Sequence, residues 1–156
     1  MPRLTIIGYG NPLRGDDGLG YHVAERLARK VEQEGRGRDI EVLVLQQLTP
    51  EVAEAVSGSE RVIFIDATCR LPPGRIACEE IVPRFPRHHP TTHHLDPAGV
   101  LALARLLDPG CAPQALLLTV GGDSFGYREA FSATAAKSVS AVDRALDQWL
   151  EGFLSP

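Results

Sequence analysis

The chain has 156 residues, with 16 basic and 20 acidic side chains, and its formal net charge at pH 7 is −4. Hydrophobic residues make up 44% and charged residues 23%, a balance typical of a globular protein. This length predicts one domain over residues 1–156, with a core that needs no disulfide or metal. No basic block stands out, and no apolar stretch approaches the roughly 20 residues that span a bilayer. We therefore expect neither nucleic acid nor a membrane as partner.

The cysteines and the first residues indicate a compartment. Cys69, Cys78 and Cys111 are odd in number, far apart and in no metal-type pair. Residues 1–3 run directly into an apolar strand pattern, without the longer apolar core and cleavage site of a signal peptide. We therefore expect a cytoplasmic protein with reduced thiols, and we interpret Cys69 as a small buried thiol.

Strand and helix patterns alternate along the chain. The first half predicts a strand over 4–7, a turn over 8–12, a helix over 19–35, a strand over 40–45 and a short helix capped by Thr49. The second half predicts a buried strand over 62–65, a proline-flanked edge strand over 76–82, a helix over 96–107, a buried strand over 115–120 and a last helix over 132–150. This order predicts an α/β three-layer sandwich, in which a twisted, mostly parallel sheet of about five strands has helices on both faces.

The turn after the first strand imitates a dinucleotide-binding fingerprint. Gly8-Tyr9-Gly10 fits the start of that pattern, but Leu13 occupies the position that requires a third small residue. Two carboxylates, Asp16-Asp17, also precede the helix and would repel a pyrophosphate there. We favour glycines that only form a tight turn, and we keep a nucleotide-binding oxidoreductase module as an alternative.

Acidic side chains follow two of the predicted strands. One member of the Asp16-Asp17 pair can cap the following helix, which leaves the other to point elsewhere. Asp66 comes directly after the apolar run of the central strand. It either closes the strand through an Asx turn or lies where α/β proteins place catalytic and metal-binding groups.

Histidines gather in one segment of the chain. Four of the five, His88, His89, His93 and His94, lie within seven residues. If Asp17, Asp66 and one histidine converge, two carboxylates and an imidazole can hold a divalent transition metal and leave positions open. A water on that metal would be acidified, and a carbonyl would be polarised. Other nucleophiles are weaker, since Ser124 does not match the hydrolase elbow and Ser132 fits a cap of the last helix.

The segment Gly8-Tyr9-Gly10-Asn11-Pro12-Leu13-Arg14-Gly15-Asp16-Asp17-Gly18-Leu19-Gly20 resembles the N-terminal signature of the hydrogenase maturation proteases. These endopeptidases trim the C-terminal tail from the large subunit of nickel–iron hydrogenases. Three shorter segments, 64–67, 91–95 and 117–122, match in the same order, so that the resemblance covers nearly the whole chain. By position, it implies that Asp17, Asp66 and His93 form the catalytic metal site, with Asp16 as a supporting acid. It also implies a twisted sheet between helices.

The resemblance further implies a substrate and a metal. The substrate would be a nickel–iron hydrogenase large-subunit precursor already loaded with nickel, and the triad would share the nickel that the precursor presents. Another divalent metal is compatible with the same ligands. Asn11 either donates a hydrogen bond to the precursor or stabilises its own turn, and the roles of His88 and His89 stay open. The alternative is a non-proteolytic metal-binding accessory protein for hydrogenase assembly.

Overall fold

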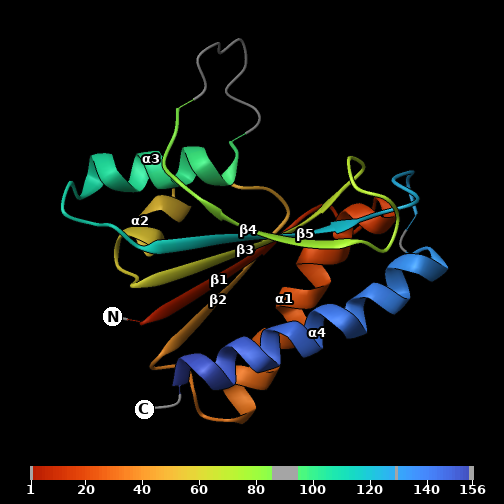
Figure 1. Cartoon of the computed structure of the whole chain (residues 1–156), viewed down its shortest axis with the longest axis horizontal. Coiled ribbons are helices and arrows are strands. Elements are labelled where there is room, and N and C mark those ends of the chain that lie inside the picture. Colours follow the sequence, from red (N-terminus) through yellow and green to blue (C-terminus); the bar gives the residue numbers. More distant parts are fainter. Residues whose placement is uncertain (1, 86–94, 129, 155–156) are drawn as a thin grey trace.

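The computed structural model describes residues 2–85, 95–128 and 130–154. A five-stranded sheet in the order β2-β1-β3-β5-β4 forms its centre (Figure 1). The strands are β1 (Leu4–Tyr9), β2 (Ile40–Leu45), β3 (Arg61–Thr68), β4 (Ile76–Ile81) and β5 (Gln114–Gly121). All neighbours pair in parallel except β4, which runs antiparallel to β5 at one edge. The predicted mostly parallel sheet and its proline-flanked edge strand are confirmed.

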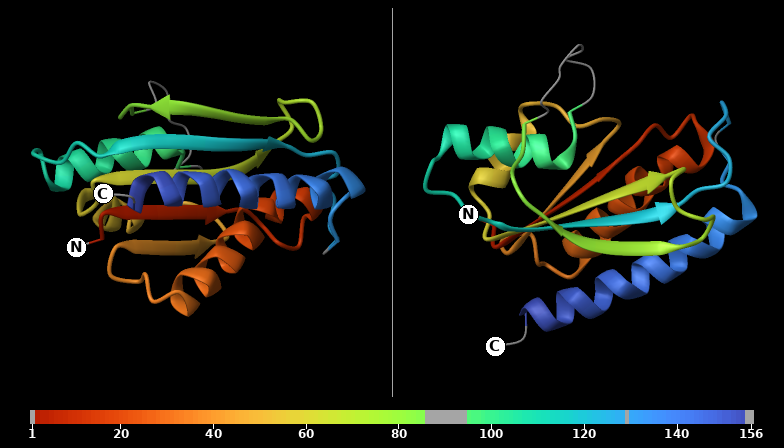
Figure 2. Two further views of the ribbon diagram at one scale, coloured as in Figure 1. Left: turned by 60° about the horizontal axis from the view of Figure 1, so that its bottom comes forward. Right: turned by 45° about the horizontal axis from the view of Figure 1, so that its top comes forward.

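Helices cover both faces of the sheet, which confirms the three-layer sandwich (Figures 1 and 2). A short 3-10 helix, η1 (Gly15–Gly18), leads into α1 (Leu19–Gln33), which shares one face with α4 (Ala133–Leu154). The other face carries α2 (Val52–Ser57) and α3 (Pro97–Leu107). Within the described ranges, no helix combines the length and apolar character needed to cross a membrane.

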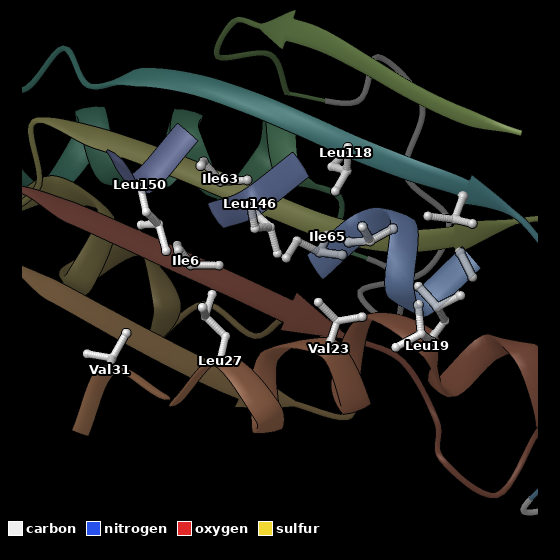
Figure 3. Close-up of a cluster of buried hydrophobic side chains, with 14 of the residues drawn as sticks. Ile6, Leu19, Val23, Leu27, Val31, Ile63, Ile65, Leu118, Leu146 and Leu150 are labelled. Carbon is white, nitrogen blue, oxygen red and sulfur yellow. The ribbon is translucent and has the colours of Figure 1, made fainter. Parts of the chain in front are cut away.

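The apolar strand patterns result from burial on both sides of β3. Its Ile63 and Ile65 point toward α1 and α4, where Leu146 also packs (Figure 3). Val62 and Phe64 alternate to the opposite face, against α2 and α3. Because consecutive side chains of a strand point to opposite faces, a strand covered twice is apolar at every position. This burial fixes β3, and with it Asp66, in the middle of the molecule.

Three local predictions need correction. β3 does not end at Asp66 but continues to Thr68, because its ladder with β5 pairs Asp66 with Thr119. Asp66 therefore does not close the strand through an Asx turn. The Thr49 hydroxyl does not cap α2; it hydrogen bonds to the Glu51 carboxylate, and α2 begins at Val52. Cys69 is exposed rather than buried, because it follows the last residue of β3 in a surface turn.

Glycines let α1 approach the sheet at backbone distance. A Cβ atom on Gly20 would lie 2.3 Å from the carbonyl oxygen of Ile65 and 2.6 Å from that of Tyr9. Gly10 has φ +146°, and a Cβ atom there would lie 1.8 Å from the carbonyl oxygen of Asp17. These glycines thus pack main chain against main chain, which agrees with the tight-turn interpretation.

Gly20→Ala is expected to lower the free energy of unfolding by about 2–4 kcal/mol, since neither carbonyl can move away without shifting a strand. Urea unfolding of the purified variant measures the loss. Gly152→Ala is the matched control, because its Cβ atom meets nothing within 4 Å. In a helix, that change should raise stability by about 0.5–1 kcal/mol. Equal stabilities for Gly20→Ala and the parent would show that the close approach is not needed.

Candidate functional site

A pocket of about 200 Å³ lies at the carboxyl edge of the parallel sheet. It is lined by residues from five separate segments, namely Tyr9, Gly10, Asp17, Gln46, Gln47, Leu48, Asp66, Ala67 and Leu95. Asp17 comes from η1 and Asp66 from β3, so the fold brings two of the three predicted metal-binding side chains to one cavity. A place beyond the carboxyl ends of the strands is where α/β sheets form their sites.

Asp17 is oriented by the turn that follows β1. The backbone N–H of Asn11 donates to Oδ2 of Asp17 at 2.9 Å. The side chain of Asn11 accepts from the backbone N–H of Leu13, also at 2.9 Å. Asn11 therefore stabilises its own turn, one of the two roles considered for it, and its main chain holds the Asp17 carboxylate at the pocket.

The surroundings of Asp66 in the pocket raise the pKa of its carboxyl group. Its pKa is raised to about 7: burial raises the pKa most and the nearby Asp17 carboxylate adds to the rise, while hydrogen bonds from the Tyr9 hydroxyl and the Ala67 backbone partly oppose it. Burial, together with Asp66, also raises the pKa of Tyr9, so that Tyr9 stays a neutral hydrogen-bond donor. Two carboxylates in a half-buried cavity repel each other, and either a proton or a cation relieves that repulsion.

Asp16 points away from the pocket and into the protein, where it is 0% exposed. Its Oδ2 accepts from the backbone N–H groups of Asp123 and Ser124 at 2.8 and 3.0 Å, and from the Ser132 hydroxyl at 2.7 Å. Its Oδ1 accepts from the Ser132 backbone at 2.8 Å. Burial alone would raise the pKa of Asp16, but these hydrogen bonds outweigh it and lower the pKa.

The two adjacent aspartates thus have separate tasks. Asp16 does not cap α1, because the N-cap position of α1 is occupied by Gly18 and no side chain of the described residues accepts a capping hydrogen bond there. Asp16 instead ties η1 to the loop between β5 and α4. Ser132 caps α4, as predicted, since its hydroxyl accepts from the Ala135 backbone at 3.1 Å. Asp16 therefore supports η1, from which Asp17 reaches the pocket.

The third predicted ligand, His93, lies outside the described residues, as do His88, His89 and His94. Leu95, two positions after His93 in the sequence, lines the pocket. Over the described parts of the chain, no group of three or more His, Cys, Asp or Glu side chains is placed to hold a metal ion. Asp17 and Asp66 alone supply two oxygen donors, which fit a divalent cation that brings or finds further ligands.

Sequence reasoning missed Tyr9 as a member of the site. Its hydroxyl donates to Asp66, and its ring packs with the cluster on the α2 and α3 side of the sheet. The available signal was its position, because Tyr9 is the last residue of β1 and shares a face with Ile7, two positions earlier.

Solved structures share the fold of this chain. A scan against protein-family models and a search of curated proteins find no match to this sequence. Among solved structures, the NiFe hydrogenase maturation protease HycI from Thermococcus kodakarensis KOD1 superposes with a TM-score of 0.75 at 22% identity, covering 96% of this chain and 92% of that one. The hydrogenase maturating endopeptidase HybD from E. coli gives a TM-score of 0.76 at 18% identity, covering 97% and 94%. The NiFe hydrogenase maturation protease HybD from Thermococcus kodakarensis gives 0.68 at 19% identity, covering 94% and 98%. The chain therefore has the fold of these maturation proteases over nearly its whole length.

Proposed function

We propose that this protein is a cytoplasmic endopeptidase of hydrogenase maturation. Its reaction would remove the C-terminal extension from a nickel-loaded large-subunit precursor of a nickel–iron hydrogenase. The convergence of Asp17 and Asp66 in one pocket is the observation that carries this proposal. The signature over residues 8–20 and the fold shared with hydrogenase maturation proteases support it.

Asp17, Asp66 and His93 would hold the nickel that the precursor presents. Two carboxylates and one imidazole form an open ligand set, which can share a metal ion without extracting it from the precursor. Nickel in this position would polarise the scissile carbonyl, activate a water molecule, or both. Cleavage would then require a precursor that has been loaded correctly.

The pocket's own groups would prepare this encounter. Asn11 fixes Asp17 through its backbone N–H, and Tyr9 fixes Asp66 through its hydroxyl. A carboxyl group whose pKa is about 7 can exchange a proton near neutral pH, and the approach of a cation would favour its ionised form. Asp66 is thus able to release a proton when the metal-bearing precursor enters.

His93→Ala is expected to abolish removal of the tail, because two carboxylates alone hold a transition metal poorly. Mass spectrometry of the large subunit, before and after incubation with the purified protein, measures the shortening. His94→Ala is the matched control and should process nickel-loaded precursor at the parent rate. If His93→Ala keeps the parent rate, the ligand assignment is wrong, and loss of activity in His94→Ala instead would move the assignment to its neighbour.

The same experiment separates the proteolytic function from the accessory alternative. A metal-binding accessory protein would use the same carboxylates to pass on nickel, but it would leave the mass of the large subunit unchanged. Shortening of the precursor by the parent protein, with loss in His93→Ala, supports the endopeptidase. An unchanged mass with every nickel-loaded precursor would overturn it.

A further inference from the structure

A groove of about 710 Å³ follows β2 on the side of the sheet that α2 covers. Its floor is apolar and is formed by Leu43, Leu45, Val52 and Ala55. Its rim is acidic and carries Glu41, Glu51, Glu54 and Asp108, and none of the described residues that line the groove is Lys, Arg or His. A surface with this charge favours a partner segment that contains basic side chains.

The strand beside the groove has an open edge. β2 is the outermost strand of the sheet and, among the described residues, pairs only with β1 (Figure 2). Alternate N–H and C=O groups of an edge strand point away from the sheet and can pair with an added chain. An extended segment of another protein can therefore add to β2 while its side chains contact the groove.

The groove and the Asp17–Asp66 pocket are continuous along the chain. Leu45 and Thr49 line the groove, and the residues between them, Gln46 to Leu48, line the pocket. The six residues of β2 extend over roughly 20 Å, from the amino edge of the sheet to this junction. A chain laid along β2 would therefore arrive at residues 46–48, which line the pocket on the side nearest β2.

We propose that this groove, together with the edge of β2, receives an extended, basic segment of the precursor and guides the adjoining chain into the pocket. This inference rests on the proposed function. It specifies how the substrate docks and which chemistry the docking segment carries: apolar side chains toward Leu43 and Leu45, and Lys or Arg toward the acidic rim.

The first test measures cleavage kinetics. The double variant Glu41→Gln/Glu54→Gln removes two rim charges with little change in shape. It should raise KM for the precursor about fivefold to tenfold with kcat unchanged, and it should weaken the increase of KM with salt. Glu79→Gln/Glu80→Gln is the matched control, because these exposed residues lie on β4 at the opposite edge of the sheet. The control should keep the parent KM.

The second test measures hydrogen exchange of the inactive Asp66→Asn protein with bound precursor. Amides of β2 that exchange rapidly in the free protein should become protected, while those of β4 should not. An unchanged KM in the rim variant, or no protection of β2 by bound precursor, would overturn the inference. So would a dimer whose β2 amides are protected without precursor, since a second copy would then occupy the edge.

The two proposals can fail separately. Shortening of the precursor by the parent protein, without any effect of the rim charges, would leave the endopeptidase intact and remove the groove. Protection of β2 by precursor that the parent protein never shortens would support the groove and overturn the endopeptidase.

Discussion

Asp66→Asn is expected to abolish removal of the precursor tail, by at least about 100-fold, and at the same time to stabilise the fold near pH 8. Activity is lost because an amide oxygen is a weaker metal ligand than a carboxylate and carries no charge. Stability is gained because the native carboxylate is half-buried and lies near Asp17. The amide still accepts the hydrogen bond from the Tyr9 hydroxyl, so the variant removes the charge and keeps the contact.

The direction of the pH dependence follows from the pKa of Asp66, which rises from 3.8 to about 7 on folding. Below both values, the carboxyl is protonated in the folded and unfolded states, and its ionisation costs nothing. Between them, the unfolded chain releases the proton and the folded protein keeps it, so stability falls as pH rises. Above about pH 7 the cost is complete, at most about 4 kcal/mol.

Urea unfolding at pH 5 and pH 8 measures this effect. The stability advantage of Asp66→Asn over the parent should grow between the two pH values, reaching about 2–4 kcal/mol at pH 8. The exposed Glu79→Gln is the control and should match the parent at both. If Asp66→Asn is less stable than the parent at pH 8, the carboxylate contributes favourable contacts that outweigh its burial. A variant that is more stable than the parent but no longer cleaves the precursor would show that the Asp66 carboxylate serves activity at a cost in folding stability.

How much the sequence can predict depends on whether a feature is local. The alternation of strands and helices is local, so the layers, the edge strand and the central β3 are predictable from apolar periodicity. The segment 62–65 is one example, since burial on both faces leaves no polar position. The end of β3 is not local, because the ladder with β5 decides how far the strand continues past Asp66.

The site divides in the same way. Asp66 is predictable from its place directly after the apolar run 62–65, and both Asp17 and Asp66 are predictable from the resemblance over residues 8–20 and 64–67. The partners of Asp16 are not, because they lie 107 to 116 positions away and depend on how the β5–α4 loop folds back. The role of Tyr9 is not predictable from the sequence either, because the hydrogen bond from its hydroxyl to Asp66 depends on how β1 and β3 pack in the fold.

Asp16→Asn is expected to lower the free energy of unfolding by about 2–4 kcal/mol at pH 7. The carboxylate accepts four hydrogen bonds from three residues in a fully buried place. An amide replaces one accepting oxygen with an NH₂ group, which then faces a backbone N–H donor or the Ser132 hydroxyl. At least one buried donor loses its partner, and the side-chain hydrogen bonds that join Asp123, Ser124 and Ser132 to η1 are weakened.

Comparison of three variants by urea unfolding separates these contributions. Ser132→Ala removes one hydroxyl and the cap of α4, and should cost only about 1 kcal/mol, since three N–H donors still reach Asp16. Asp123→Ala is the control, because Asp123 contributes its backbone N–H rather than its exposed side chain. Parent-like stability in Asp16→Asn would contradict the tether.

The pH dependence of this tether is opposite to that of Asp66. The pKa of Asp16 is lowered in the folded protein, so its stabilising effect is present above the ordinary value of 3.8 and is lost as pH falls through the folded value. Low pH should therefore weaken the hydrogen bonds of Asp16 that hold η1, and it should also relieve the repulsion between Asp17 and Asp66. Asp16 and Asp17 are adjacent in the sequence but act in opposite ways. The charge of Asp16 stabilises the contact between η1 and the β5–α4 loop. The charge of Asp17 repels that of Asp66 in the pocket, and a cation can relieve this repulsion.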